Sequence, residues 1–193
     1  MKRSMRLVAV AVAVLVAVAP VAATADEPDT SWKETKREAK RQRIDATAGE
    51  TLEELFADSA KAKELYDNSV AYAVFDNLKL SLIISGGGGN GVAVDKASGK
   101  RTYMQMGTVG LNIGLGGQKY QVVFLFQDHK TFKDFVKKGW QADASANAVA
   151  GTEGVNPSAN FVNGLAVFQI TEAGLMLQAD IAGTKYWKNK KLN

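Results

Sequence analysis

The sequence contains no cysteine and a single histidine, His129. Without cysteine the chain forms no disulfide bonds and offers no site for a lipoprotein anchor, so its stability depends on its core. One histidine without cysteine argues against a zinc site, and we expect no metal and no cofactor. There is no G-x-S-x-G motif, and the carboxylates show no spacing that predicts an acid–base pair. We therefore expect no catalytic residues and no enzymatic activity.

The first 25 residues have the composition of a secretory signal peptide. A basic start precedes an apolar stretch over residues 7–19, and Ala23 and Ala25 fit a signal-peptidase site. This stretch is shorter than the ~20 apolar residues that span a bilayer. We expect cleavage after Ala25 and a periplasmic or secreted protein, with an uncleaved anchor as the alternative. Cleavage lowers the formal net charge from +4 to +1, with 21 Lys and Arg against 20 Asp and Glu, which removes the general case for a nucleic-acid partner.

We expect residues 26–47 to form a charged helix or a flexible arm, and residues 48–193 to form the folded domain. Five basic residues in the first segment recur at helical spacing: Lys33, Lys36, Arg37, Lys40 and Arg41. On a helix they form one basic stripe, and each is worth about 1 kcal/mol near an anionic membrane. The alternative is a solvated helix in which Glu34 and Glu38 merely support helicity.

Two further patterns concern local structure. Thr51, with Glu54 three residues later, predicts the start of a second helix that continues to about residue 67. Asp76 and Asn77 are typical of a turn before a strand that begins at Leu78.

A glycine-rich stretch follows, with glycine at Gly86, Gly87, Gly88, Gly89 and Gly91. It matches G-x-G-x-x-G, but residues 92–95 continue as a strand and no helix follows to hold a pyrophosphate, so we expect no nucleotide. We interpret it as a glycine-rich turn or bulge that bends the sheet.

Alternating and continuous apolar runs predict the strands. Residues 92–95 and 101–106 predict a hairpin, residues 109–115 a strand with a glycine face, and residues 120–126 a central strand. Asp128 and Gly139 predict the two ends of a helix. Residues 142–150 alternate like a strand although alanine favours helix, and a last hairpin is expected around residues 172–174. The sum is α+β, with a strongly curved, largely antiparallel sheet (a partial barrel) of about eight strands and two or three packing helices.

The order of these features resembles the SYLF domain, also called the lipid-binding or actin-regulator SYLF family. The residues that carry the resemblance are the run at 71–75, the glycines at 86–91, 110, 114, 116 and 117, Phe132, the segment 143–151, and Gly174 with Leu175. The resemblance covers about residues 48–187. It implies a non-enzymatic module that binds anionic phospholipids, phosphoinositides in eukaryotic members, with help from an N-terminal basic helix. Fungal members also bind actin and carry an SH3 domain, which this sequence lacks.

The export signal points to the bacterial secreted branch, where an actin role is out of place. We expect an exported protein that associates with anionic phospholipids or the membrane surface, with the basic stripe as its contact. The alternative is a structural or protein-interaction domain of the cell envelope, with envelope proteins as partners and no lipid ligand.

Overall fold

A computed structural model describes residues 30–81, 85–110, 116–141, 160–171, 174–176 and 183–193. The predicted signal peptide with its cleavage after Ala25, and the strand expected at residues 142–150, lie outside these residues.

The first described element is a long helix, α1 (Thr30–Asp58), and the short helix α2 (Ala60–Asp67) follows it. The predicted helix start at Thr51 is wrong, because Thr51 lies within α1 and its hydroxyl donates to the carbonyl of Thr47 at 2.7 Å. The break comes at Ser59, whose side chain accepts from the backbone N–H of Ala62 and so caps α2. Accordingly α1 continues through residues 47 and 48, where a boundary was expected between the basic segment and the domain.

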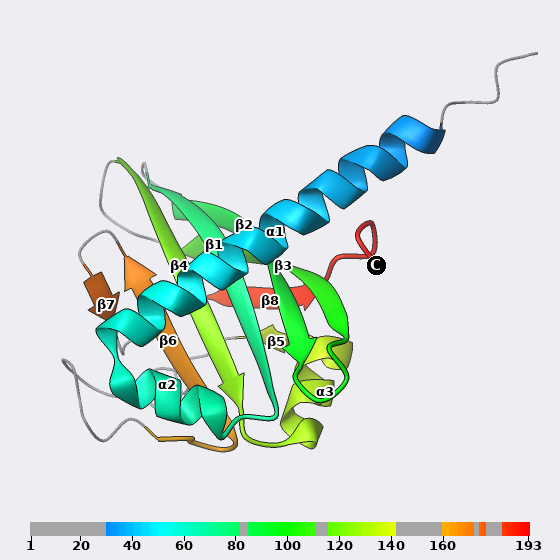
Figure 1. Ribbon diagram of the computed structural model, residues 1–193. Coiled ribbons are helices and arrows are strands. Elements are labelled where there is room, and N and C mark those ends of the chain that lie inside the picture. Colours follow the sequence, from blue (N-terminus) through cyan, green and yellow to red (C-terminus); the bar gives the residue numbers. More distant parts are fainter. Residues whose placement is uncertain (1–29, 82–84, 111–115, 142–159, 172–173, 177–182) are drawn as a thin grey trace, which may run out of the picture.

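The strands of the described residues form one antiparallel sheet of eight members in the order β5-β8-β3-β2-β1-β4-β6-β7. Their bounds are β1 (Ala71–Ser81), β2 (Ser85–Asp95), β3 (Arg101–Gly110), β4 (Gly116–Phe126), β5 (Trp140–Gln141), β6 (Leu165–Thr171), β7 (Gly174–Met176) and β8 (Thr184–Lys188). The predicted hairpin β2–β3 and the central place of β4 are confirmed. The predicted class, α+β with a partial barrel, is also confirmed (Figure 1).

Aromatic contacts show how strongly the sheet curls. Four steps across the sheet separate β8 from β4, which in a flat sheet is about 19 Å. The ring centroids of Tyr186 in β8 and Phe124 in β4 are nevertheless 5.0 Å apart, and Tyr186 also lies 4.7 Å from Phe75 in β1. The sheet therefore folds toward the face that carries these rings.

The glycine-rich turn predicted at Gly86, Gly87, Gly88, Gly89 and Gly91 is wrong, because all five residues lie inside strand β2. Two of them, Gly89 and Gly91, must be glycine because atoms of β1 occupy the space that a Cβ would take. A Cβ at Gly91 would meet the backbone oxygen of Val74 and the ring of Phe75.

The turn predicted at Asp76 and Asn77 is also wrong. Strand β1 continues through both residues, and Asn77 is only 2% exposed. A Cβ at its partner Gly89 would meet the amide of Asn77. The room for Asn77 therefore comes from a neighbouring strand, which the local sequence does not reveal.

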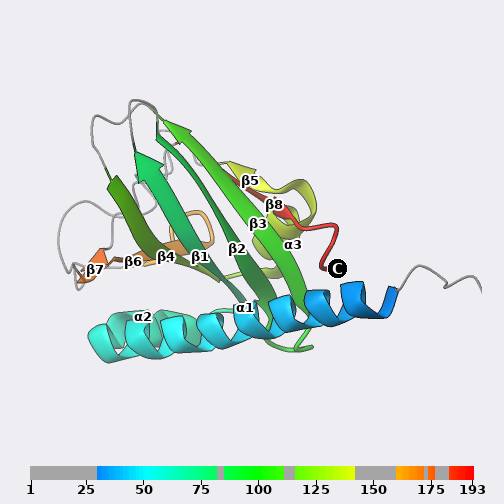
Figure 2. The same cartoon turned by 90° about the horizontal axis from the view of Figure 1, so that it is seen from above.

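Two apolar layers pack on the sheet, and Figure 2 shows α1 and α2 on one face of it and α3 on the other. On the curled side, α3 (His129–Lys138) packs Phe132 and Phe135 against the sheet. As predicted, Asp128 caps this helix and Gly139 ends it, with φ of 76°. On the outer side, α1 and α2 cover the sheet with Leu52, Leu55 and Leu65, which lie in the second apolar layer. The outer face is the one that α1 crosses.

Candidate functional site

The first third of α1 extends beyond the sheet, as Figure 1 shows. Every residue from 31 to 40 is exposed, and burial begins only near Arg41 and Ile44. The predicted basic stripe lies on this exposed segment. It is therefore presented to the surroundings rather than packed on the body.

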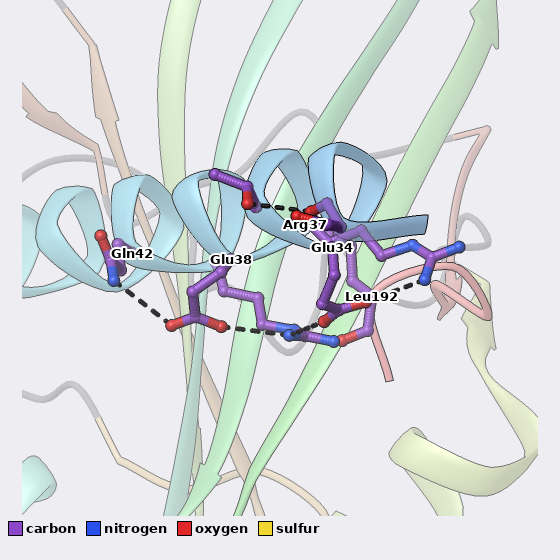
Figure 3. A network of polar contacts seen from close by, with 8 residues as sticks. Glu34, Arg37, Glu38, Gln42 and Leu192 are labelled. Atoms are coloured by element: carbon purple, nitrogen blue, oxygen red, sulfur yellow. Dashed lines mark hydrogen bonds and ion pairs between the residues drawn. The ribbon is translucent and has the colours of Figure 1, made fainter. Parts of the chain in front are cut away.

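Two of the five predicted basic residues are engaged within the protein. Arg37 donates to one carboxylate oxygen of Glu34 at 2.9 Å, and Arg41 donates to its other oxygen at 2.9 Å and to Glu38 at 3.1 Å (Figure 3). Hydrogen bonds from Arg37 and then Arg41 lower the pKa of the Glu34 carboxyl, so this acid stays charged beside them. Arg41 also donates to the carbonyl of Leu192 at 2.9 Å.

The other three are lysines without an acidic partner among the described residues: Lys33, Lys36 and Lys40. The ammonium of Lys36 lies 4.4 Å from the ring centroid of Trp32, and that of Lys33 lies 5.9 Å from it. Trp32 is 45% exposed. Cationic groups beside an exposed indole are the combination found at membrane interfaces, where an amphipathic ring sits at head-group level.

Residues 189–193 form a tail that is fastened beside this end of α1. The backbone N–H of Asn189 donates to the carbonyl of Tyr103 at 3.0 Å, and the side chain of Asn193 bonds both the N–H and the carbonyl of Tyr103. Leu192 is 4% exposed and belongs to the outer apolar layer. The hydroxyl of Tyr103 donates to Asp45 of α1 at 2.9 Å. The tail and the helix are thus held to one strand, β3.

This arrangement creates a groove of about 610 Å³ between α1, β8 and the tail, which we call the tail groove. Its lining comprises Lys36, Arg37, Lys40, Gln105, Trp187, Lys188, Asn189, Lys190, Lys191 and Leu192. Five lysines and one arginine line it, and no acidic residue does. Like charges so placed raise the local concentration of anions, because their fields add.

A second groove, of about 550 Å³, lies between α1 and the outer face of the sheet, and we call it the helix groove. Its lining comprises Lys36, Ala39, Lys40, Arg43, Ile44, Thr47, Ala48, Val74, Asp76 and Asn90. Lys36 and Lys40 line both grooves and therefore stand between them.

The remaining predicted features concern a metal, a nucleotide and His129. Within the described part of the chain, no group of three or more His, Asp or Glu residues could hold a metal ion. The G-x-G-x-x-G stretch is paired on both sides by antiparallel strands and does not precede a helix. His129 lies 3.4 Å from Asp95 through Nδ1, at the exposed start of α3. Of the described helices, none is both long enough and apolar enough to cross a membrane.

The chain is similar to a protein from Aeromonas veronii called beta cell expansion factor A. The two are 44% identical over 158 residues, which are 82% of this chain and 60% of that protein. The chain therefore spans well under two thirds of the length of this relative. No model of a known protein family matches the chain.

Sequence reasoning found the α1 half of the tail groove and missed the other half. Trp187, Lys188, Lys190 and Lys191 stand together in the sequence, so the signal was visible as a basic cluster beside an aromatic residue. The sequence did not indicate that this cluster lies beside α1, because residues about 150 positions apart meet only through the sheet and the fastened tail.

Proposed function

We propose that the protein is an exported, non-enzymatic lipid-binding protein that associates with anionic phospholipid surfaces through the tail groove and the exposed end of α1. The observation that carries the proposal is the convergence of Lys36 and Lys40 with Lys188, Lys190 and Lys191 in a groove without acidic residues. Five lysines at about 1 kcal/mol each supply enough attraction for reversible binding to an anionic bilayer.

Charge along α1 supports one orientation. The exposed first third carries the three available lysines, Lys33, Lys36 and Lys40. The second half carries exposed acids at Glu50, Glu53, Glu54 and Asp58. An anionic surface attracts the first part and repels the second, so the helix would approach with its protruding end. Trp32 and Trp187 lie beside these lysines and would enter the head-group region.

The resemblance to the SYLF domain supports the same class of function, since that family is associated with anionic phospholipids. The name of the Aeromonas protein speaks of an effect on beta cells and not of a ligand. The proposal therefore rests on the lysines themselves and must be tested on them.

The test is sedimentation of the purified protein with vesicles of phosphatidylglycerol mixed with phosphatidylcholine, and with phosphatidylcholine alone. We expect binding to the anionic vesicles only, weakened by added salt because screening shortens the reach of each charge. Replacing two lysines by glutamate, as Lys36→Glu with Lys40→Glu, should weaken partitioning at least about thirtyfold, from about 1 kcal/mol for each lost charge. The tail pair, Lys190→Glu with Lys191→Glu, should have a similar effect.

The matched control is Lys130→Glu with Lys133→Glu on α3, which makes the same change of charge on exposed residues outside both grooves. If this control weakens binding as much as the groove variants do, net charge rather than the groove governs it. Absence of binding to every vesicle at low salt would remove the proposal and favour the interaction domain of the cell envelope.

Export is tested separately by the intact mass of the protein recovered from the periplasm or the medium of its host. We expect a chain that begins at Asp26. A chain that still begins at Met1 would contradict cleavage of a signal peptide.

A further inference from the structure

The helix groove differs from the tail groove in chemistry. Its wall and floor include Ala39, Ile44 and Ala48 from α1 and Val74 from β1, with Ala48 and Val74 only 5% and 2% exposed. Small side chains at Ala39 and Ala48 leave the space between helix and sheet unfilled. The result is an apolar channel in an otherwise polar surface, with a volume in the range of small-molecule sites, ~300–1,000 Å³.

Three basic residues also line the helix groove: Lys36, Lys40 and Arg43. All three are exposed, and none has an acidic partner among the described residues. Asp76 and Asn90, a cross-strand pair of β1 and β2, complete the lining. The lining thus combines apolar surface with positive charge.

The groove is also elongated. Its lining on α1 extends from Lys36 to Ala48, about 18 Å along a helix. Along β1, Val74, Asp76 and Leu78 point to the same face of the sheet. Leu78 is 43% exposed, and its partner on β2 is Gly88, which has no side chain. Leu78 does not line the groove, but it adds exposed apolar surface on the far side of Asp76, where the end of a long chain could lie.

We infer that the helix groove holds the acyl chain of a single-chain anionic phospholipid, a lysophospholipid, with its phosphate between Lys36, Lys40 and Arg43. This inference rests on the proposed affinity for anionic lipid and names the form in which the lipid is taken. Lys36 and Lys40 line both grooves, so they meet the head group whether the lipid lies in a bilayer or in the groove. We assign one acyl chain to the groove because its lining follows a single helix and its volume is about 550 Å³.

The experiment is titration of the purified full-length protein with monomeric lysophosphatidylglycerol, below the concentration at which it forms micelles, with native mass spectrometry for stoichiometry. We expect one lipid per protein. Lysophosphatidylcholine, with the same chain and a zwitterionic head group, should bind roughly tenfold or more weakly, and glycerol 3-phosphate, with no chain, should not compete.

A matched pair of variants isolates the groove. Ala39→Trp places a large side chain at a lining residue that is exposed on α1, so folding is preserved, and should weaken lysolipid binding roughly tenfold or more. Ala46→Trp makes the same change at an exposed residue of α1 that lines neither groove and should leave binding unchanged. Neither variant removes a charge, so both should still bind anionic vesicles.

The outcomes separate this inference from the proposed function. Vesicle binding without lysolipid binding overturns the groove assignment and leaves the membrane proposal standing. Lysolipid binding without vesicle binding overturns the membrane proposal and leaves the groove assignment standing. If the protein binds neither lysolipid nor vesicles, both proposals are overturned. Equal loss in the two tryptophan variants also overturns the assignment. If the protein forms a dimer that Ala39→Trp disrupts and lysolipid does not, the groove would instead bind a second copy of the chain.

Discussion

Replacing Gly91 by alanine tests how the sheet is built. Gly91 lies in β2 opposite Phe75 of β1, and Phe75 is fully buried among the rings of the curled face. A Cβ at Gly91 would fall 2.5 Å from Cδ1 of Phe75 and would also meet the backbone oxygen of Val74. A flexible side chain could move aside, but a paired backbone oxygen and a packed ring cannot do so cheaply.

The magnitude follows from this contact. Adding one methyl group to a packed core costs about 1–3 kcal/mol, and the clash with backbone places Gly91→Ala near the upper limit, about 3 kcal/mol. For a chain of this size, 1 kcal/mol shifts the melting temperature by roughly 2–4 °C. We therefore expect a fall of roughly 6–12 °C.

Gly86 provides the matched control in the same strand. A Cβ there would have no atom within 4 Å, and the residue is exposed. Gly86→Ala should change stability by no more than about 0.5 kcal/mol, with a small gain because alanine restricts the unfolded chain. Urea denaturation followed by circular dichroism gives both free energies of unfolding.

Equal stability of Gly91→Ala and Gly86→Ala would contradict a steric need for glycine at position 91. It would mean that β1 and β2 do not approach as closely at Phe75 as described. The glycines of β2 would then serve another purpose than making room for the side chains of β1.

Two further predictions concern Lys96 and Tyr103. The ammonium of Lys96 donates to the carbonyl of Tyr66 in the last turn of α2 at 2.7 Å and to that of Ser69 just after the helix at 3.0 Å, so Lys96→Met should cost about 1–2 kcal/mol in urea denaturation. Lys61→Met, which removes an exposed ion pair, should cost at most about 0.5 kcal/mol, and equal costs would argue against this role of Lys96. Burial, together with a hydrogen bond to the Asp45 carboxylate, raises the pKa of Tyr103 to about 12 from an ordinary value of 10.0. As the pH rises, the unfolded chain releases the Tyr103 proton before the folded protein does. The stability that Tyr103 contributes is therefore complete below about pH 10 and is lost as the pH rises toward about 12. Between about pH 9 and about pH 11, Tyr103→Phe should lose less stability than the unmodified protein, and an equal loss would contradict the raised pKa of Tyr103.

Local signals predicted the local structure well. Asp128 and Gly139 were correctly predicted as the two ends of α3, because a cap depends on residues only three or four positions apart. The helix start predicted at Thr51 was wrong, because a capping sequence begins a helix only where the preceding helix has ended. Ala48, Leu52 and Leu55 instead keep one buried face against the sheet, so α1 continues through this point.

For the candidate site, the structure places all five predicted basic residues on α1. The sequence left open whether their segment is a helix or a flexible arm. It did not distinguish the lysines from Arg37 and Arg41, whose hydrogen bonds go to Glu34, Glu38 and Leu192. Leu192 lies 151 positions from Arg41, and no periodicity extends that far.

Residues close together in the chain were enough to predict the class of the fold, the central strand and the spacing of the basic residues on one face of a possible helix, since apolar period and helical spacing act over a few residues. The tertiary structure was needed to show that Gly89 and Gly91 of β2 must lack a side chain, because Asn77 and Phe75 of β1 occupy the space of a Cβ there. It likewise decided that the lysines of α1 and of the tail share a groove. In both cases the deciding neighbour is remote along the chain, and only the pairing of strands in a curled sheet brings it close.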